Sequence, residues 1–427
     1  MRIIEVGFSG TVGTSQMGPV STVISELSNR FVERGHEVIL TDVVARAPRH
    51  LLDQRVKVVE LPVNAESLIQ SQSTNPAIRV WRDWRNSHRY VSALASRTDL
   101  EPDIVHFHSP LPAFVAQRSF GMRTAYTAHT PLWSIPRPAN EASNGRARKR
   151  FSPLARLPEF IERSVIKRSE VAVGLGGYVA DAVPGANVVT IPNGLDCKTW
   201  APIDRAAART SLGIAQDEFV VVFAGRIFAE KGVDVLLDAV RLAAPAIPRL
   251  AVHLVGPLSG SFDTRDETIT DYAREMMKVA QDLPARFVGF INSRTGNFRS
   301  YLAAADVFVL PSRREPQGLV VLEAMAMGTP VIGSATGGIP DMVSPDVGYL
   351  FPPGDARALA ACLEKANADR EALATMRKNA RARVEALYSW EQAASRYLVA
   401  FQQVTRNRGR AVLPVDEDQL KDKGSPA

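Results

Sequence analysis

The chain has 427 residues, of which 45% are hydrophobic and 22% are charged. This length suits two domains of about 200 residues each, and the composition excludes a disordered or collagen-like chain. Its only two cysteines, Cys197 and Cys362, exclude a disulfide framework and a cysteine-based zinc motif. No apolar run reaches the ~18 residues of a membrane-spanning helix, and the N-terminus lacks a secretory signal. We therefore expect a cytoplasmic protein.

The formal net charge of +6 lies entirely in the first half of the chain. Residues 1–200 contain 24 Lys and Arg against 18 Asp and Glu, whereas residues 201–427 contain 27 of each. A charge of +6 is ordinary for a chain of this length. Its confinement to one half nevertheless favours an anionic partner there: a phosphate-bearing substrate, an anionic lipid surface or a nucleic acid.

Short, β-branched apolar runs alternate with helix-period segments in the first 200 residues. The predicted strands cover 3–8, 37–44, 56–63, 103–109, 124–130, 171–176 and 188–194. The clearest helices are predicted over 20–34 and 111–120. Strands that are apolar throughout are typical of sheets covered on both faces, so the alternation predicts a parallel α/β sheet.

The same pattern starts again in the second half. Strands are predicted over 219–225, 250–256, 286–290, 307–312 and 329–334, with helices over 233–243, 266–282, 318–327 and 356–366. The polar stretch 196–216 is predicted to be the linker between the two arrays.

We therefore predict an α/β protein with two Rossmann-like, doubly wound parallel-sheet domains that face a cleft. The domains cover 1–200 and 201–388, a closing helix over 389–406 packs back on the first domain, and 407–427 form a disordered tail. Because ligands in such sheets bind beyond the carboxyl ends of the strands, functional residues should lie in loops just after strands.

The segment after the predicted strand 307–312 contains two carboxylates. Glu315 lies in a loop, Gly318 opens a helix, and Glu323 lies on that helix. The free N–H groups of a helix N-terminus suit phosphate or sugar oxygens, and two carboxylates can accept hydrogen bonds from hydroxyls. The spacing alone favours a simpler interpretation, in which the two glutamates are unrelated.

The loop after the predicted strand 219–225 contains Arg226 and Lys231. An arginine can bind a phosphate through two hydrogen bonds and a lysine as a point charge, but two solvated surface cations would give the same pattern. The glycine-rich loop 7–18 resembles a phosphate cradle without matching either common phosphate-binding motif.

Three histidines lie at predicted strands of the first half. His106 and His108 alternate along one strand, and His129 ends the next. The pair suggests a metal ion, but no third ligand stands at a metal-binding spacing, so we expect no metal site. The sequence also lacks a serine or cysteine nucleophile motif.

Taken together, the motifs resemble those of glycosyltransferase family 4, retaining enzymes of the GT-B fold. In chain order they are Arg-Gly-His at 34–36, Asp-Ile-Val-His-x-His at 103–108, Ala-His-Thr at 128–130, Ile-Pro-Asn-Gly-Leu-Asp at 191–196, Gly-Arg then Glu-Lys-Gly at 225–232, and Glu-x7-Glu with Glu-Ala-Met-Ala-x-Gly-x-Pro at 315–330. The resemblance covers about residues 1–405 and is most specific over 188–356.

This resemblance implies that a hexose moves from a nucleotide-diphosphate donor, a UDP or GDP sugar, to a hydroxyl acceptor. The transfer would retain the anomeric configuration and need neither a metal nor a cofactor. By position, the implied catalytic residues are His129, Arg226, Lys231 and Glu315. The implied donor-binding residues are Gly18, Arg226, Lys231, Glu315, Gly318, Leu319 and Glu323.

The resemblance also implies a role for each residue. Arg226 and Lys231 would bind the diphosphate. Glu323 would bind the ribose hydroxyls, and Glu315 would contact the transferred sugar. The N–H groups of Gly318 and Leu319 would meet sugar and phosphate oxygens, His129 would lie beside the sugar, and Gly18 would line the loop nearest the diphosphate. These cations would neutralise the charge that develops on the leaving diphosphate.

Three positions depart from the family pattern. Pro19 follows Gly18 where a second glycine is usual, Gln317 replaces an aromatic residue, and 173–175 lack the usual serine. Pro19 suits the first position of a helix. The change at Gln317 affects the wall of the sugar pocket.

The acceptor side of the family is the first domain, whose most unusual segment is 146–168, with eight basic and two acidic residues. Its interleaved apolar residues indicate an amphipathic helix that either contacts an anionic membrane or packs on the core with a solvated basic face. A second basic and aromatic stretch, 79–90, either adds to the acceptor site or covers the sheet. We expect a lipid-linked or polysaccharide acceptor and a cytoplasmic enzyme peripheral to the inner membrane face.

Other functions remain open at this point. A nucleic-acid-binding protein would explain the basic half, but no such motif is present, so we expect no nucleic-acid partner. Closer alternatives are a GT-B sugar-nucleotide epimerase or hydrolase, and a non-catalytic relative that binds a nucleotide sugar.

Overall fold

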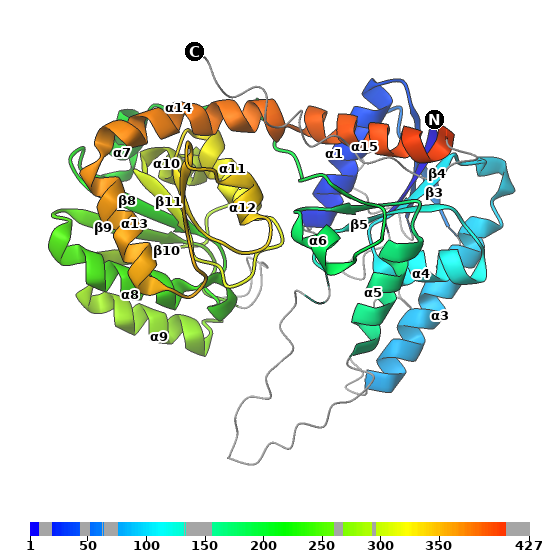
Figure 1. The fold of residues 1–427 in the computed structure, drawn as a ribbon, viewed down its shortest axis with the longest axis horizontal. Helices are drawn as coiled ribbons and strands as arrows, with labels where there is room; N and C mark the ends of the chain where they lie inside the picture. Colours follow the sequence, from blue (N-terminus) through cyan, green and yellow to red (C-terminus); the bar gives the residue numbers. More distant parts are fainter. Residues whose placement is uncertain are drawn as a thin grey trace.

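The computed structural model describes residues 1–7, 19–42, 52–61, 63, 76–131, 133, 156–259, 268–292 and 296–406. These residues form two parallel sheets flanked by helices (Figure 1). The expected fold class, two Rossmann-like doubly wound domains, is confirmed.

The first sheet has the strand order β3-β2-β1-β4-β5-β6-β7. Its strands are β1 (Arg2–Val6), β2 (Glu37–Asp42), β3 (Lys57–Glu60), β4 (Ile104–Phe107), β5 (Thr124–Ala128), β6 (Val171–Gly174) and β7 (Val188–Thr190). All the pairings are parallel, and β1 lies between β2 and β4. The strand order reverses there, which places the topological switch point beyond the ends of β1 and β4.

Helices cover both faces of this sheet. One face packs on α1 (Pro19–Glu33) and α15 (Trp390–Arg406), and the other on α3 (Pro76–Ala95), α4 (Pro110–Ser119) and α5 (Leu157–Arg168). The short α6 (Tyr178–Ala182) follows β6. The apolar strands therefore have no face open to water, which is why they read as continuous hydrophobic runs.

The second sheet has the order β10-β9-β8-β11-β12-β13. Its strands are β8 (Phe219–Ala224), β9 (Leu250–Val255), β10 (Ala285–Gly289), β11 (Val307–Leu310), β12 (Val331–Ser334) and β13 (Gly348–Phe351). The helices around it are α7 (Arg205–Leu212), α8 (Val233–Ala243), α9 (Asp271–Val279), α10 (Gly296–Ala304), α11 (Leu319–Ala326), α12 (Ile339–Met342), α13 (Ala356–Ala368) and α14 (Arg370–Leu387). The switch point lies between β8 and β11.

The predicted linker 196–216 is not irregular throughout, because α7 lies within it. Asp204 caps this helix by accepting a hydrogen bond from the N–H of Ala207. Arg209 on α7 is fully buried, and its guanidinium donates to Asp306 at 2.8 Å and to four main-chain carbonyls. The predicted linker thus contains a helix that packs on the core of the second sheet through Ala208 and Arg209, and the role of 196–216 as the connection between the two arrays stays a prediction.

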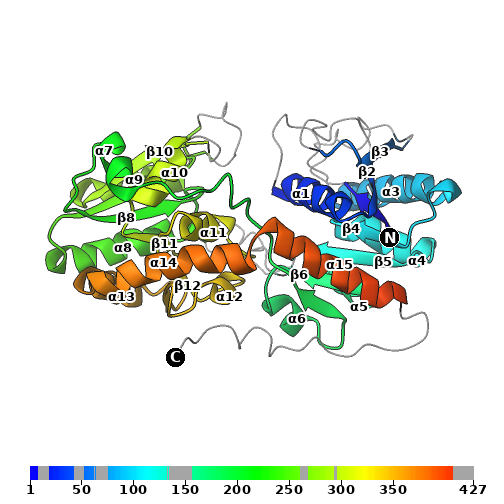
Figure 2. The same cartoon turned by 90° about the horizontal axis from the view of Figure 1, so that it is seen from above.

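The chain returns to the first sheet at its end. Figure 2 shows α15 beside α1 and β6. The rings of Tyr397 and Phe401 lie 6.4 Å and 6.1 Å from that of Phe31 on α1, and Arg34 donates to the carbonyl of Glu391 at 2.9 Å. The residue boundaries of the domains stay a prediction, and the predicted tail 407–427 lies outside the described residues.

Pro19 is the first residue of α1, which agrees with the expectation that it suits a helix start.

Within the described ranges, no helix combines the length and hydropathy that crossing a bilayer requires.

Candidate active site

Lys231 and Glu315 meet at the carboxyl ends of β8 and β11. The ammonium Nζ of Lys231 lies 2.6 Å from Oε2 of Glu315, and the hydroxyl of Ser312 donates to the same oxygen at 3.2 Å. The Glu315 side chain is 8% exposed and that of Lys231 is 23% exposed. The sequence places these residues 84 positions apart, and the switch point of the sheet brings them together.

Glycines allow the main chain to hold Glu315 in place. Gly318 has φ +85°, and a Cβ there would lie 3.1 Å from Cγ of Glu315. Gly337 has φ +55° and a Cβ there would overlap the carbonyl of Glu315, while the N–H of Gly338 donates to that carbonyl at 3.1 Å. A side chain at either of the first two positions would displace the Glu315 loop.

The helix α11 starts directly beside Glu315. Gly318 is its N-cap residue, so the N–H groups of Leu319 and Val320 begin the helix, where the dipole favours an anion. Glu323 lies one and a half turns further on, and burial raises the pKa of its carboxyl to about 7. Among the described residues no side-chain or main-chain donor within hydrogen-bond distance of this carboxylate is seen, so it can accept hydrogen bonds from a ligand.

Arg226 shares the loop between β8 and α8 with Lys231. It is half-buried, and its guanidinium lies 5.2 Å above the ring of Phe228. This contact holds the cation at the strand end. Gly18 lies outside the described residues, so its predicted place near the diphosphate is not described.

His129 follows β5 and is held by other histidines. Its Nε2 lies 2.8 Å from Nδ1 of His108, with the two rings stacked at 23°. Nε2 of His108 lies 2.7 Å from Glu5, whose carboxylate is also 3.0 Å from Nδ1 of His106. The sequence predicted His129 as a site residue, but Glu5 gave no signal because a lone glutamate in a strand is indistinguishable from a surface one.

Glu5 also changes the argument about a metal ion. The sequence showed no third ligand beside His106 and His108, whereas the structure brings a carboxylate to both. The three groups are buried, and the ring nitrogens that point away from Glu5 have partners of their own: Thr127 for Nε2 of His106 and His129 for Nδ1 of His108. In this arrangement the Glu5 carboxylate lies at hydrogen-bond distance from both rings, so the residues form a hydrogen-bonded cluster. The expectation of no metal site stays a prediction.

The two units meet through Gln317, one of the departures from the family pattern. Its amide oxygen accepts from the N–H of Asn193 at 3.0 Å, and its amide nitrogen donates to the carbonyl of Asn193 at 3.1 Å. Gln317 is 3% exposed. An aromatic residue could not form this pair, so Gln317 ties the Glu315 loop to the segment after β7 instead of lining a pocket with a ring.

A second contact between the units lies after β6. The N–H of Gly177 donates to Asp341 at 2.9 Å. Burial raises the pKa of the neighbouring Tyr178, and the charges of Glu162, Glu315 and Asp341 raise it further. The sequence argument did not single out Tyr178, since an isolated tyrosine after a glycine turn carries no motif.

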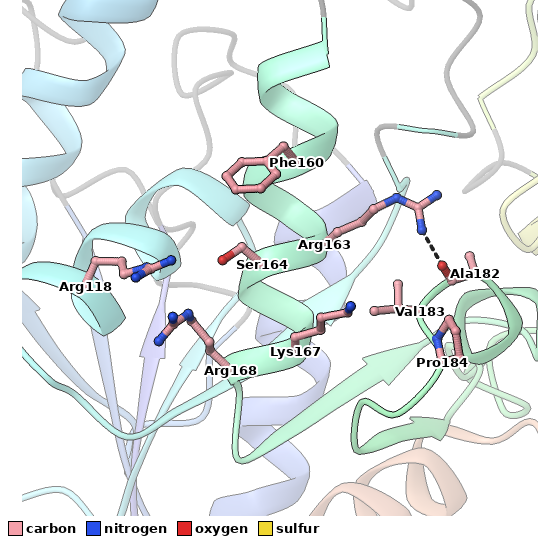
Figure 3. A pocket seen from close by; sticks show the side chains of 9 residues that line it. All are labelled: Arg118, Phe160, Arg163, Ser164, Lys167, Arg168, Ala182, Val183 and Pro184. Atoms are coloured by element: carbon pink, nitrogen blue, oxygen red, sulfur yellow. Dashed lines mark hydrogen bonds between the residues drawn. The ribbon is translucent and has the colours of Figure 1, made fainter.

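A basic hollow of about 580 Å³ lies along α5 (Figure 3). Its lining residues are Arg118, Phe160, Arg163, Ser164, Lys167, Arg168, Ala182, Val183 and Pro184. Arg163 is bound to Glu159 and to the carbonyl of Ala182, and its guanidinium lies 4.6 Å above the ring of Trp133. Residues 134–155, which include the first ten residues of the basic stretch noted in the sequence, lie outside the described ranges.

Two sequence profiles match the chain. Residues 19–199 match the profile described as Glycosyltransferase Family 4, and residues 204–383 match that of Glycosyl transferases group 1. A relative named D-inositol 3-phosphate glycosyltransferase, from Geodermatophilus obscurus, is 30% identical over 410 residues, which are 91% of this chain and 85% of the relative. The chain belongs to glycosyltransferase family 4.

A further relative extends the comparison. The GDP-mannose-dependent alpha-(1-6)-phosphatidylinositol dimannoside mannosyltransferase of Mycobacterium tuberculosis is 27% identical over 413 residues, 93% of this chain and 95% of the relative. The chain is therefore an enzyme, a glycosyltransferase related to inositol phosphate and mannosyltransferases.

Solved structures confirm the GT-B fold. Sucrose-phosphate synthase from Thermosynechococcus elongatus has a TM-score of 0.71 at 24% identity, covering 95% of this chain and 99% of that chain. Anabaena HepE in complex with UDP has a TM-score of 0.68 at 19% identity, covering 94% and 100%.

Proposed function

We propose that this glycosyltransferase moves a hexose from a UDP or GDP sugar to a hydroxyl acceptor, with retention of the anomeric configuration. We further propose that no metal ion or cofactor takes part. The observation that carries the proposal is the Lys231–Glu315 ion pair at the start of α11. One and a half turns further along lies the carboxylate of Glu323, to which no group in the described part of the chain donates. The site thus brings together a lysine, the first N–H groups of α11 and two carboxylates, beside the carboxyl ends of β8 and β11.

Each group has a chemical task in this reaction. Cleavage of the bond between sugar and phosphate leaves negative charge on the diphosphate, which Lys231, Arg226 and the first N–H groups of α11 would stabilise. Lys231 would exchange its contact with Glu315 for the phosphate, so that Glu315 can accept hydrogen bonds from sugar hydroxyls. Glu323 would accept hydrogen bonds from the ribose.

Thermal stabilisation of the enzyme by nucleotides and nucleotide sugars tests the donor site. We would measure the melting temperature with UDP, GDP, UDP-glucose and GDP-mannose in the presence of a chelator. A ligand at 100 times its dissociation constant adds about 2.7 kcal/mol of stability. A shift with one base that persists in chelator and disappears in Lys231→Ala supports the proposal, with Lys278→Ala on α9 as the surface-lysine control.

Product analysis separates the remaining alternatives. A retained anomeric linkage on an added acceptor supports the transferase. A free or isomerised sugar without an acceptor would instead favour the hydrolase or epimerase, and donor binding without any turnover would favour a non-catalytic relative.

For the acceptor, we propose a lipid-linked alcohol reached from the cytoplasmic face of an anionic membrane, with segment 146–168 as the contact. The name of the mycobacterial relative, which includes a phosphatidylinositol dimannoside, supports a lipid over a polysaccharide. In the described part of that segment, Phe160 is 61% exposed, and Lys167 and Arg168 are exposed. Trp81, on α3 in the same helical layer, is also 61% exposed. Exposed aromatic groups among cations suit the headgroup region of a bilayer.

Flotation with vesicles tests this contact. We expect the protein to float with anionic vesicles and to stay behind with neutral ones, and added salt should reduce the anionic binding. The double variant Lys167→Glu, Arg168→Glu should weaken flotation, whereas Lys278→Glu, Lys378→Glu, an equal charge change on α9 and α14, should not. Equal flotation of both variants would contradict the proposal.

A further inference from the structure

The imidazole of His129 is one end of a continuous chain of hydrogen-bonding groups. The chain runs from His129 to His108 at 2.8 Å and from His108 to Glu5 at 2.7 Å. It continues from Glu5 to His106 at 3.0 Å. Glu5 lies on β1 and His106 on β4, while His108 and His129 directly follow β4 and β5. The parallel pairing of β1, β4 and β5 therefore brings the four side chains together.

The other end of the chain is anchored in α15. Nε2 of His106 lies 2.7 Å from the hydroxyl of Thr127, which lies 3.0 Å from the hydroxyl of Tyr397. Tyr397 is 1% exposed and packs on His106 with 5.4 Å between the rings. The C-terminal helix therefore closes the cluster, and only His129 at its far end is partly exposed.

The charge states of the chain follow from its burial. Burial by itself raises the pKa of Glu5, but the contacts with His106 and His108 outweigh it and hold this pKa at about 2. Burial lowers the pKa of His108 to about 4 and that of His129 well below its usual value, and the neighbouring imidazoles add to both effects. At neutral pH, Glu5 is thus an anion while His108 and His129 are neutral.

These charges determine the position of each proton. The Glu5 carboxylate can only accept, so Nε2 of His108 donates to it. Neutral His108 then has no proton on Nδ1, and that nitrogen must accept from Nε2 of His129. Neutral His129 in turn has no proton on its Nδ1. Among the described residues, no side chain or main-chain group bonds this last nitrogen.

We infer that Glu5 and His108 are positioning residues, which fix the tautomer of His129 so that its Nδ1 is a hydrogen-bond acceptor offered to the substrate. The inference rests on the proposed function and makes it more specific. The substrate group that meets His129 must be a hydrogen-bond donor, such as a sugar hydroxyl. A phosphate or carboxylate oxygen at that place would face a lone pair and be repelled.

The tautomer can be measured directly in the unaltered protein. Long-range ¹⁵N–¹H correlation of ¹⁵N-histidine-labelled protein at pH 7.5 distinguishes the two nitrogens, and the His129→Gln variant assigns its signals. We expect a proton on Nε2 and none on Nδ1. A proton on Nδ1, or a positively charged ring, would overturn the inference whether or not the donor proposal is correct.

Kinetics of variants test the positioning role. In Glu5→Gln the amide can donate to His108 and allow its tautomer to reverse, so kcat should fall about tenfold or more while the KM for the donor stays nearly constant. The tautomer of His129 should change in the same variant. His253→Gln, at a buried imidazole bonded to Arg286 in the second domain, is the matched control and should keep kcat.

The outcomes separate the two proposals. If the wild-type enzyme shows neither donor binding nor transfer, the proposed function fails while the spectrum still tests the tautomer. If the wild-type enzyme is active and Glu5→Gln shifts the tautomer without lowering kcat, the positioning role fails alone. A stoichiometric metal in the purified protein would also overturn it, because a metal on Glu5, His106 and His108 would displace the protons. If Glu5→Gln does not fold, the wild-type spectrum and His108→Gln carry the test.

Discussion

The ammonium group of Lys231 neutralises the carboxylate of Glu315 at 2.6 Å, although the two residues belong to loops after different strands. In the absence of a donor, the ion pair holds an ammonium group and a carboxylate beside the N-terminus of α11. A donor diphosphate would replace the carboxylate as the partner of Lys231. The first prediction follows from this exchange.

Replacing Lys231 should affect catalysis more than stability. Lys231→Ala removes one stabilising charge from the leaving diphosphate, and the loss of one such group lowers kcat by about 100- to 1,000-fold. Glu315 is 8% exposed and loses its cation in this variant but keeps the hydrogen bond from Ser312, so we expect a moderate fall in the melting temperature. Steady-state kinetics and thermal unfolding of this variant and Lys278→Ala would test the prediction. A large loss of stability with unchanged kcat would assign the pair a structural role only.

Glu323 should make nucleotide binding depend on pH. Its pKa of about 7 means that part of the free enzyme carries a proton there at neutral pH. If ribose hydroxyls bind the ionised form, nucleotide affinity should rise between pH 6 and pH 8. Titration calorimetry should show this rise in the wild type and a weak, pH-independent affinity in Glu323→Gln. A rise that persists in the variant would contradict the assignment.

The same raised pKa has a consequence for stability. Between the unfolded pKa near 4.5 and the folded pKa near 7, the folded state binds more protons than the unfolded state. Stability from this group is therefore present at low pH and is lost as the pH rises through 7. Glu323→Gln should raise the melting temperature at pH 8 and leave it unchanged at pH 4.5. Equal shifts at both pH values would exclude ionisation as the cause.

Gln317 should couple the donor loop to the first unit. Gln317→Leu keeps a similar volume but leaves the N–H and carbonyl of Asn193 without their partner, which costs about 1–3 kcal/mol for each buried group left unsatisfied. Denaturant unfolding should show this loss, and the KM for the donor should rise as the Glu315 loop loosens. The control is Gln403→Leu at an exposed position of α15. An unchanged KM would limit Gln317 to stability.

The contact between Gly318 and Glu315 can be tested against a second glycine, Gly213, that has the same kind of left-handed backbone but no such contact. Gly318 and Gly213 have φ values of +85° and +66°, but a Cβ meets Cγ of Glu315 only at Gly318 and nothing within 4 Å at Gly213. Alanine at either position should cost about 1 kcal/mol through the left-handed backbone. Only Gly318→Ala should also lower kcat, by moving Glu315. Equal activity of the two variants would contradict the role of this contact.

Local patterns in the sequence predicted most of the framework. The apolar runs marked the strands of both sheets apart from β13, whose Gly-Tyr-Leu-Phe run is short and only partly buried. Arg226, Lys231, Glu315 and Glu323 were singled out by their places after predicted strands, but their spacing alone left simpler interpretations open, and their roles came from the resemblance to family 4. Their positions along the chain can be read without the fold, whereas their assigned roles stay predictions.

The partners of these residues depend on the packing of distant segments. Glu5 and His108 are 103 positions apart and Asn193 and Gln317 are 124 positions apart, and no periodicity links either pair. The order of strands in each sheet and the contact between the two units bring them within hydrogen-bond distance. The kind of chemistry that each loop offers therefore follows from its local sequence. The long-range packing decides which side chains surround His129 and what anchors the Glu315 loop.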